Sequence, residues 1–127
     1  MAQGFLKSFD KELDVHSAGT EPAKEINPVA VEVMREAGID LTTHYPKSVD
    51  NYLNELWDYV ITVCDDANEA CPFFAGRVKH RIHMGFEDPS KATGTREFVY
   101  GKFRKIRDEI REEFLNFYIK EIANHEH

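Results

Sequence analysis

The sequence predicts an α/β domain in which a parallel sheet carries helices on both faces. Two short apolar runs rich in β-branched and aromatic residues, at 57–64 and 78–84, are typical of buried strands. Amphipathic helical patterns alternate with strand-like segments along the chain, and this alternation favours a parallel sheet. The 127 residues form a single domain, 1–127, that is long enough to bury a core.

The N-terminal segment predicts a helix and then a short strand. Met1, Phe5 and Phe9 recur every four residues, which gives an apolar helical stripe. No Ser, Thr, Asp or Asn precedes the stripe, so the first N–H groups of the helix lack a capping side chain. Leu13–Ala18 follows as a short predicted strand that ends at Gly19.

A second helix and the first long strand come next. Asn27–Pro28 is a strong helix start, with Asn as the N-cap and Pro in the first helical position, and Gly38 ends the helix. The apolar face of this helix consists of Ala30, Val33, Met34 and Ala37. Leu53 and Leu56 predict a short helix immediately before the strand at 57–64.

The C-terminal half predicts a second long strand, a turn and a long helix. Val78–Met84 forms the strand, and Asp88–Pro89 supplies turn chemistry after it. The helix carries an apolar stripe at spacings of three and four residues: Val99, Phe103, Ile106, Ile110, Phe114 and Phe117. Its other face mixes acidic and basic residues, so we expect the stripe in the core and the charged face in solvent.

Cys64 and Cys71 are the only cysteines, and both lie on the segment that follows the strand at 57–64. If that segment is helical, their Cα atoms lie about 10 Å apart, because a helix rises about 1.5 Å per residue. A disulfide needs Cα atoms within about 7 Å. A Cys64–Cys71 bond therefore requires the segment to unwind or to be irregular, and we interpret the pair as a redox-dependent switch.

Two other interpretations of the cysteines stay open. In the first, they are small buried hydrophobic residues that never pair. In the second, His80 and His83 join them in a zinc site, although two histidines three apart on a strand face opposite sides of the sheet.

Asp88 is a candidate catalytic group because of its place in the predicted sheet. Sites in parallel sheets lie beyond the C-terminal ends of the strands. Cys64 follows one strand and Asp88 follows another, so both are expected at the same edge. The alternative is that Asp88–Pro89 is only a turn.

Composition excludes several classes of partner. The net charge of −7 argues against nucleic acid. No apolar run approaches membrane-spanning length, and no signal peptide precedes the first helix, so no membrane partner is expected. Two cysteines do not make a secreted disulfide framework, which favours a cytoplasmic protein. We predict no cofactor and no resident metal.

Several short motifs together carry a resemblance that covers nearly the whole chain in one order. They are Ser17–Gly19, Asn27–Pro28, Gly38–Asp40, Thr62–Ala67, Cys71–Pro72, Gly85–Pro89 and Arg107–Ile110. This set resembles the thioredoxin-coupled arsenate reductases, which are built on the low-molecular-weight protein tyrosine phosphatase fold. The agreement of many motifs makes the resemblance specific.

The resemblance also implies a strand and an anion-binding Cys-x5-Arg loop before the first helix. Met1–Gly4 resembles the start of the helix just after that loop, so the nucleophilic cysteine and the anion-binding arginine are absent there, and the substrate-binding residues are unknown. The domain is therefore expected to be N-terminally truncated and to lack its first strand, a loss of about fifteen residues. Such a chain is expected to be inactive alone, and less stable than a complete homologue unless it dimerises through the incomplete sheet.

The resemblance assigns roles to the three candidate catalytic residues. Asp88 corresponds to the general acid, Cys64 to the thiol that attacks the cysteine–arsenic adduct, and Cys71 to the thiol that ends paired with Cys64. Arsenate is then the substrate of the complete form, and thioredoxin is the partner that reduces the pair. Gln3 and Lys47 stand where part of the family has acids that help to hold potassium, so no potassium site is predicted.

Alternative functions remain. A tyrosine phosphatase of the same fold usually has tyrosines after Asp-Pro, whereas Ser90 follows Pro89 here, and the cysteine pair has no role in that chemistry. A non-catalytic protein that binds arsenic(III) through its two thiols, or that binds thioredoxin, is a second alternative. A remnant without function is the third.

Overall fold

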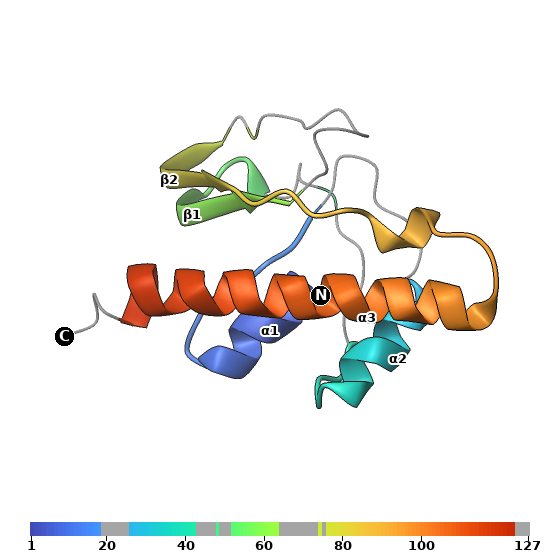
Figure 1. Cartoon of the computed structure of the whole chain (residues 1–127). Helices are drawn as coiled ribbons and strands as arrows, with labels where there is room; N and C mark the ends of the chain where they lie inside the picture. Colours follow the sequence, from blue (N-terminus) through green and yellow to red (C-terminus); the bar gives the residue numbers. More distant parts are fainter. Residues whose placement is uncertain (19–25, 43–47, 49–51, 64–73, 75, 124–127) are drawn as a thin grey trace.

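The computed structural model describes residues 1–18, 26–42, 48, 52–63, 74 and 76–123. Three helices, two strands and two short helical turns lie in these ranges. They are α1 (Ala2–Phe9), α2 (Pro28–Glu36), β1 (Leu56–Thr62), β2 (Arg77–His83), η2 (Pro89–Lys91), α3 (Arg96–Phe117) and η3 (Tyr118–Ile122). Figure 1 shows the sheet above the long helix α3, with α1 and α2 packed along the same helix.

The two described strands form a parallel pair, as the sequence predicts. Trp57 lies opposite Val78, Tyr59 opposite His80 and Ile61 opposite Ile82. Of these residues, Tyr59, Ile61 and Ile82 pack against the core formed by the helices. The connection at 64–73, which would cross from β1 to β2, lies outside the described residues.

His80 and His83 lie on opposite faces of this sheet. The His80 ring stacks on Tyr59, with ring centroids 5.0 Å apart. His83 is three residues further along the strand. Because side chains alternate between the two faces, it points to the opposite side. Its Nδ1 lies 2.7 Å from Thr62 Oγ1. Since the two imidazoles point to different sides of β2, a zinc site that uses both is wrong.

The predicted strand at Leu13–Ala18 is also wrong. This segment is irregular, and its described carbonyl contacts come from α1 side chains: Lys7 Nζ donates to Leu13 O, and Gln3 Nε2 donates to Val15 O over 3.1 Å. A strand needs a neighbouring backbone to pair with, and no described strand lies beside this segment. Its residues therefore remain irregular despite their strand-like pattern.

The predicted short helix before β1 is wrong at its C-terminal end. Leu56 is the first residue of β1, paired with Arg77 in the register. Leu53 lies in a turn, and Trp57 Nε1 donates to Tyr52 O over 2.9 Å, which holds this turn against the start of the strand. Pairing with β2 makes Leu56 part of the strand, and the residues next to Leu56 in the sequence do not reveal this pairing.

The apolar stripes of the helices are buried, as predicted, and form two neighbouring core clusters. Five of the six predicted residues of α3 are buried: Phe103, Ile106, Ile110, Phe114 and Phe117. Phe5 of α1 is 1% exposed and stacks on Phe9, while Val33 and Met34 of α2 are fully buried. Ala37, predicted on the same face of α2, is exposed at the C-cap.

Helix α2 begins and ends as its sequence predicts. Asn27 Oδ1 accepts a hydrogen bond of 2.8 Å from Val29 N at the N-terminus. Gly38 follows the C-cap with a φ of +82°, in the left-handed region that suits glycine. These two signals fix the length of the helix.

Arginines of α3 hold the C-terminal end of α2. Arg104 binds Glu36 through two hydrogen bonds of 2.9 and 2.8 Å. Arg107 Nη1 donates to Val33 O over 2.9 Å and to Glu36 Oε1 over 3.0 Å. Because these bonds favour the carboxylate, with the hydrogen bond from Arg104 as the largest cause, the pKa of Glu36 falls to about 2.

Glu36 is expected to give the fold an acid-sensitive component. A carboxyl whose folded pKa is lowered stabilises the fold above its unfolded pKa, near 4.3, and loses that contribution as the pH falls toward the folded value. The stability advantage of the wild type over Glu36→Gln is therefore expected to shrink as the pH is lowered from 5 toward 2. Urea unfolding across this range measures it, with Glu109→Gln on the exposed face of α3 as the control. An advantage that stays constant with pH would contradict the assignment.

Candidate functional site

The ends of β1 and β2 lie side by side, and the chain stays paired beyond them. Met84 N donates to Thr62 O over 2.8 Å, and Phe86 N donates to Val63 O over 3.2 Å. Val63 immediately precedes Cys64 in the sequence, and Phe86 stands two residues before Asp88. The structure therefore leads the chain from both strands toward one edge. Cys64 and Cys71 themselves lie outside the described residues, so their roles and their pairing stay predictions.

Asp88 forms the turn that its sequence predicts. Its Oδ1 accepts hydrogen bonds from Ser90 N over 3.0 Å and from Ser90 Oγ over 2.7 Å, which caps η2. Both of these bonds go to Oδ1, no described residue donates to Oδ2, and the side chain is half-buried. The turn role and a proton-transfer role are compatible, because one oxygen holds the turn and the other is left for chemistry.

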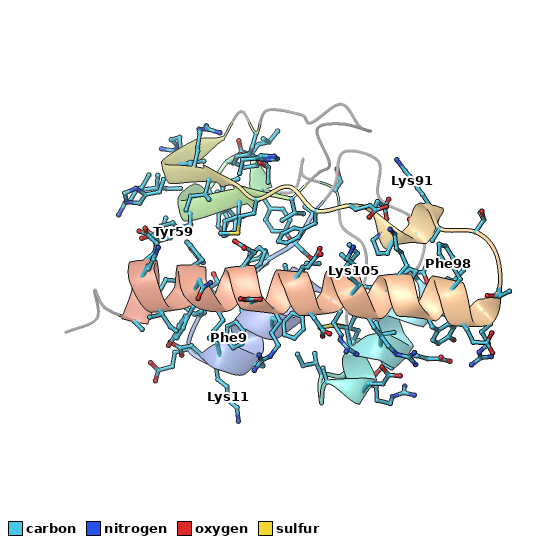
Figure 2. All side chains as sticks on the ribbon, in the orientation of Figure 1. Phe9, Lys11, Tyr59, Lys91, Phe98 and Lys105 are labelled. Carbon is cyan, nitrogen blue, oxygen red and sulfur yellow. The ribbon has the colours of Figure 1, made fainter. Side chains whose placement is uncertain are left out.

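Three contacts fix this turn on α3. The ring of Phe86 stacks on Phe114 with centroids 6.2 Å apart, Pro89 is buried, and Lys102 Nζ lies 3.0 Å from Glu87 Oε2. Figure 2 shows Lys91 of η2 toward the N-terminal half of α3, whereas Tyr59 lies toward its C-terminal end. The turn therefore lies at the end of the sheet where the strands finish.

The sequence motif at Ser17 has a structural explanation. Ser17 Oγ donates to Gln3 Oε1 over 2.6 Å, and the amide of Gln3 also donates to Val15 O. Gln3 thus links α1 to the segment that follows it. Both ends of its neutral amide are therefore engaged in hydrogen bonds. Lys47 lies outside the described residues.

One spacing was missed in the sequence. Cys71 and Arg77 are six residues apart and match the pattern Cys-x5-Arg. In an anion-binding loop the arginine precedes a helix, whose N–H groups help to bind the anion. Arg77 instead begins β2, and its Nη2 donates to Asn54 O over 3.2 Å. The surroundings of Arg77 therefore do not form such a loop.

The comparison with known families decides the assignment. A family described as "Low molecular weight phosphotyrosine protein phosphatase" matches residues 1–127. The chain belongs to this family. The parallel strands and the helices that the structure describes agree with the α/β fold of this family.

Relatives within the family are named arsenate reductases. The arsenate reductase of Bacillus licheniformis is 44% identical over 118 residues, which are 92% of this chain and 84% of the relative. That of Halalkalibacterium halodurans is 42% identical with the same coverage. A solved structure, an arsenate reductase in the phosphate binding state, has a TM-score of 0.75 at 25% identity and covers 94% of this chain and 86% of its own.

The ranges that the structure describes contain neither a metal-ligand cluster nor a membrane-spanning helix. In those ranges no three or more His, Cys, Asp or Glu side chains are grouped so that they could bind a metal. None of the described helices combines the length and the apolar character that crossing a bilayer requires.

Proposed function

We propose that the complete form of this protein reduces arsenate to arsenite by a relay of thiols. The relationship to arsenate reductases at 42–44% identity supports this activity. The observation that carries the assignment of residues is the paired backbone beyond the strands, since Phe86 N bonds to Val63 O. This pairing leads toward Cys64 on one side and toward Asp88 on the other.

In the proposed reaction an upstream cysteine thiolate attacks arsenic(V), and Asp88 protonates the oxygen that leaves as water. Cys64 then attacks the sulfur of the adduct. The electron pair of the broken S–As bond stays on arsenic, which leaves as arsenite. Cys71 attacks Cys64 next, frees the first cysteine and closes the Cys64–Cys71 disulfide. Two thiols have then lost two electrons in total, the number that arsenic has gained.

We propose thioredoxin as the dithiol that reduces this disulfide and returns the two electrons. If the segment between the two cysteines is helical when they are reduced, they lie too far apart for a bond, and oxidation then requires the segment to unwind. Unwinding gives a reductase access to the disulfide. The cytoplasm, where thioredoxin keeps thiols reduced, is the proposed compartment.

We propose that the nucleophile and its Arg-containing loop precede Met1 in the complete form. Cys64 and Cys71 both have later roles in the relay, and the sequence has no third cysteine. The match spans 84% of the first two relatives, which leaves room for an additional segment. The strand in this segment is proposed to pair with β1. When the segment is missing, the edge of β1 is left exposed, and we propose that two copies of the chain dimerise through it.

The test is arsenate turnover with and without the proposed segment. The strand and Cys-x5-Arg loop of the B. licheniformis relative are joined in frame before Met1, and arsenate-dependent oxidation of thioredoxin is measured. We expect turnover by the fusion and none by the 127-residue chain or by the Cys64→Ser fusion. Hydrolysis of phosphotyrosine without arsenate turnover would assign the protein to phosphatase chemistry instead.

The native start is tested separately. The reading frame before Met1 is determined, and the native protein is weighed by intact mass spectrometry. A frame that continues through Cys-x5-Arg, with a correspondingly larger mass, agrees with the proposal. A stop codon in that frame and a mass equal to 127 residues would contradict it and favour a thiol-binding role.

A further inference from the structure

An ion pair links the residue before Asp88 to the long helix. Lys102 Nζ lies 3.0 Å from Glu87 Oε2. The Lys102 side chain is only 27% exposed, which is low for a residue type that is almost always on the surface. Its stem therefore packs along the helix surface, and its ammonium group is held toward the turn. Glu87 directly precedes Asp88 in the sequence, so the ion pair holds the backbone next to Asp88.

The other anchors of the turn on α3 leave its orientation relative to that helix less defined. Phe86 on Phe114 and the buried Pro89 are apolar contacts, which hold the backbone near α3 but have little directional preference. A charged hydrogen bond from lysine to carboxylate is directional. Because Ser90 engages Oδ1 of Asp88, the orientation of the turn decides where Oδ2 points.

We propose that Lys102 is a positioning residue for Asp88: its ion pair with Glu87 sets the turn that presents the aspartate at the edge of the sheet. The proposal rests on the proposed function, in which Asp88 protonates the leaving oxygen. Lys102 itself does not reach the reacting atoms in this account. It acts through Glu87.

The test follows the Ser90 amide of the 127-residue chain by solvent-exchange NMR, because that amide donates to Asp88. Lys102→Met and Glu87→Gln are each expected to speed its exchange about two- to fivefold, the range open to a partly exposed ion pair. The double variant is expected to be no faster than either single variant, since both remove the same interaction. Lys102→Arg is expected to preserve the wild-type rate.

Two controls separate positioning from a general loss of stability. Lys105→Met removes an exposed lysine of the same helix and is expected to leave the exchange rate of the Ser90 amide unchanged. The exchange of the Ile106 amide, in the buried part of α3, is expected to stay at the wild-type rate in every variant. The proposal would be overturned if the Ser90 amide exchanged at the same rate in Lys102→Met as in Lys105→Met. It would also be overturned if the increases in that rate were additive in the double variant.

Kinetics of the fusion protein add a second readout. Lys102→Met is expected to lower kcat for arsenate by a factor similar to the Ser90 effect and to leave KM unchanged, because proton donation is not needed for binding. A raised KM with unchanged kcat would overturn the positioning role. A wild-type fusion that fails to reduce arsenate would overturn the proposed function instead, and the Ser90 comparison would still decide whether Lys102 sets the turn.

Discussion

Phe114→Ala is expected to lower the free energy of unfolding by about 3–5 kcal/mol, the usual cost of deleting a buried aromatic ring. Phe114 is 2% exposed and contacts the rings of Phe86 and Phe117. It thus joins α3 to the segment that leads into the Asp88 turn. The cavity would open in the core between α3 and the segment that carries Phe86.

Phe98→Ala provides the matched control for this prediction. Phe98 lies on the same helix, labelled near its N-terminal end in Figure 2, and is 54% exposed. Its removal is expected to change the free energy of unfolding by no more than about 0.5 kcal/mol. Urea unfolding followed by circular dichroism measures both variants. Equal losses in the two variants would contradict the position of Phe114 in the core.

Arg107→Met is expected to lower the free energy of unfolding by about 2 kcal/mol, in the range for hydrogen bonds to charged groups. The Arg107 side chain is 14% exposed and donates to Val33 O, Glu36 and Asp108. In a regular α-helix Ala37 N would donate to Val33 O, but here it donates to Met34 O. The guanidinium of Arg107 takes its place as the donor to Val33 O. The substitution leaves a helix carbonyl and a carboxylate without that donor.

Two variants define the contribution of Arg107. Arg111→Met, one turn along α3 on an exposed position, is expected to have little effect. Arg104→Met removes a more exposed partner of Glu36 and is expected to cost less than about 1 kcal/mol. Thermal unfolding ranks the three variants. A ranking in which Arg107→Met is no worse than Arg111→Met would contradict a structural role for this arginine.

Local sequence signals were sufficient where the structure depends on local interactions. The stripe from Phe103 to Phe117 predicted the buried face of α3, because helical periodicity alone decides which side chains share a face. Asn27, Pro28 and Gly38 predicted both ends of α2, because caps depend on the nearest residues. The predicted bounds of both strands lie within two residues of the observed ones.

Non-local interactions explain where sequence reasoning failed. Leu13–Ala18 has the alternation of a strand, but a strand forms only beside a partner, and no described strand lies there. Leu56 has the pattern of a helix end, yet its pairing with Arg77 extends β1. The Lys102–Glu87 pair joins residues fifteen apart in the sequence, and no local spacing rule could have found it.

The candidate site was predicted in outline for a physical reason. Parallel strands end at one edge, so the residues after 57–64 and after 78–84 had to approach each other. The dual role proposed for Asp88 could not be predicted from the dipeptide Asp88–Pro89, because it depends on Ser90 engaging only one carboxylate oxygen.

The most direct test of the thiol relay is the stoichiometry of a single turnover. The fusion protein, fully reduced and without thioredoxin, is mixed with arsenate, and arsenite and protein disulfides are measured by mass spectrometry. The proposed thiol relay predicts one arsenite for each Cys64–Cys71 disulfide. It also predicts that a Cys71→Ser fusion stops with Cys64 bonded to the upstream cysteine. Arsenite released without that disulfide, or released by the Cys64→Ser fusion, would contradict it.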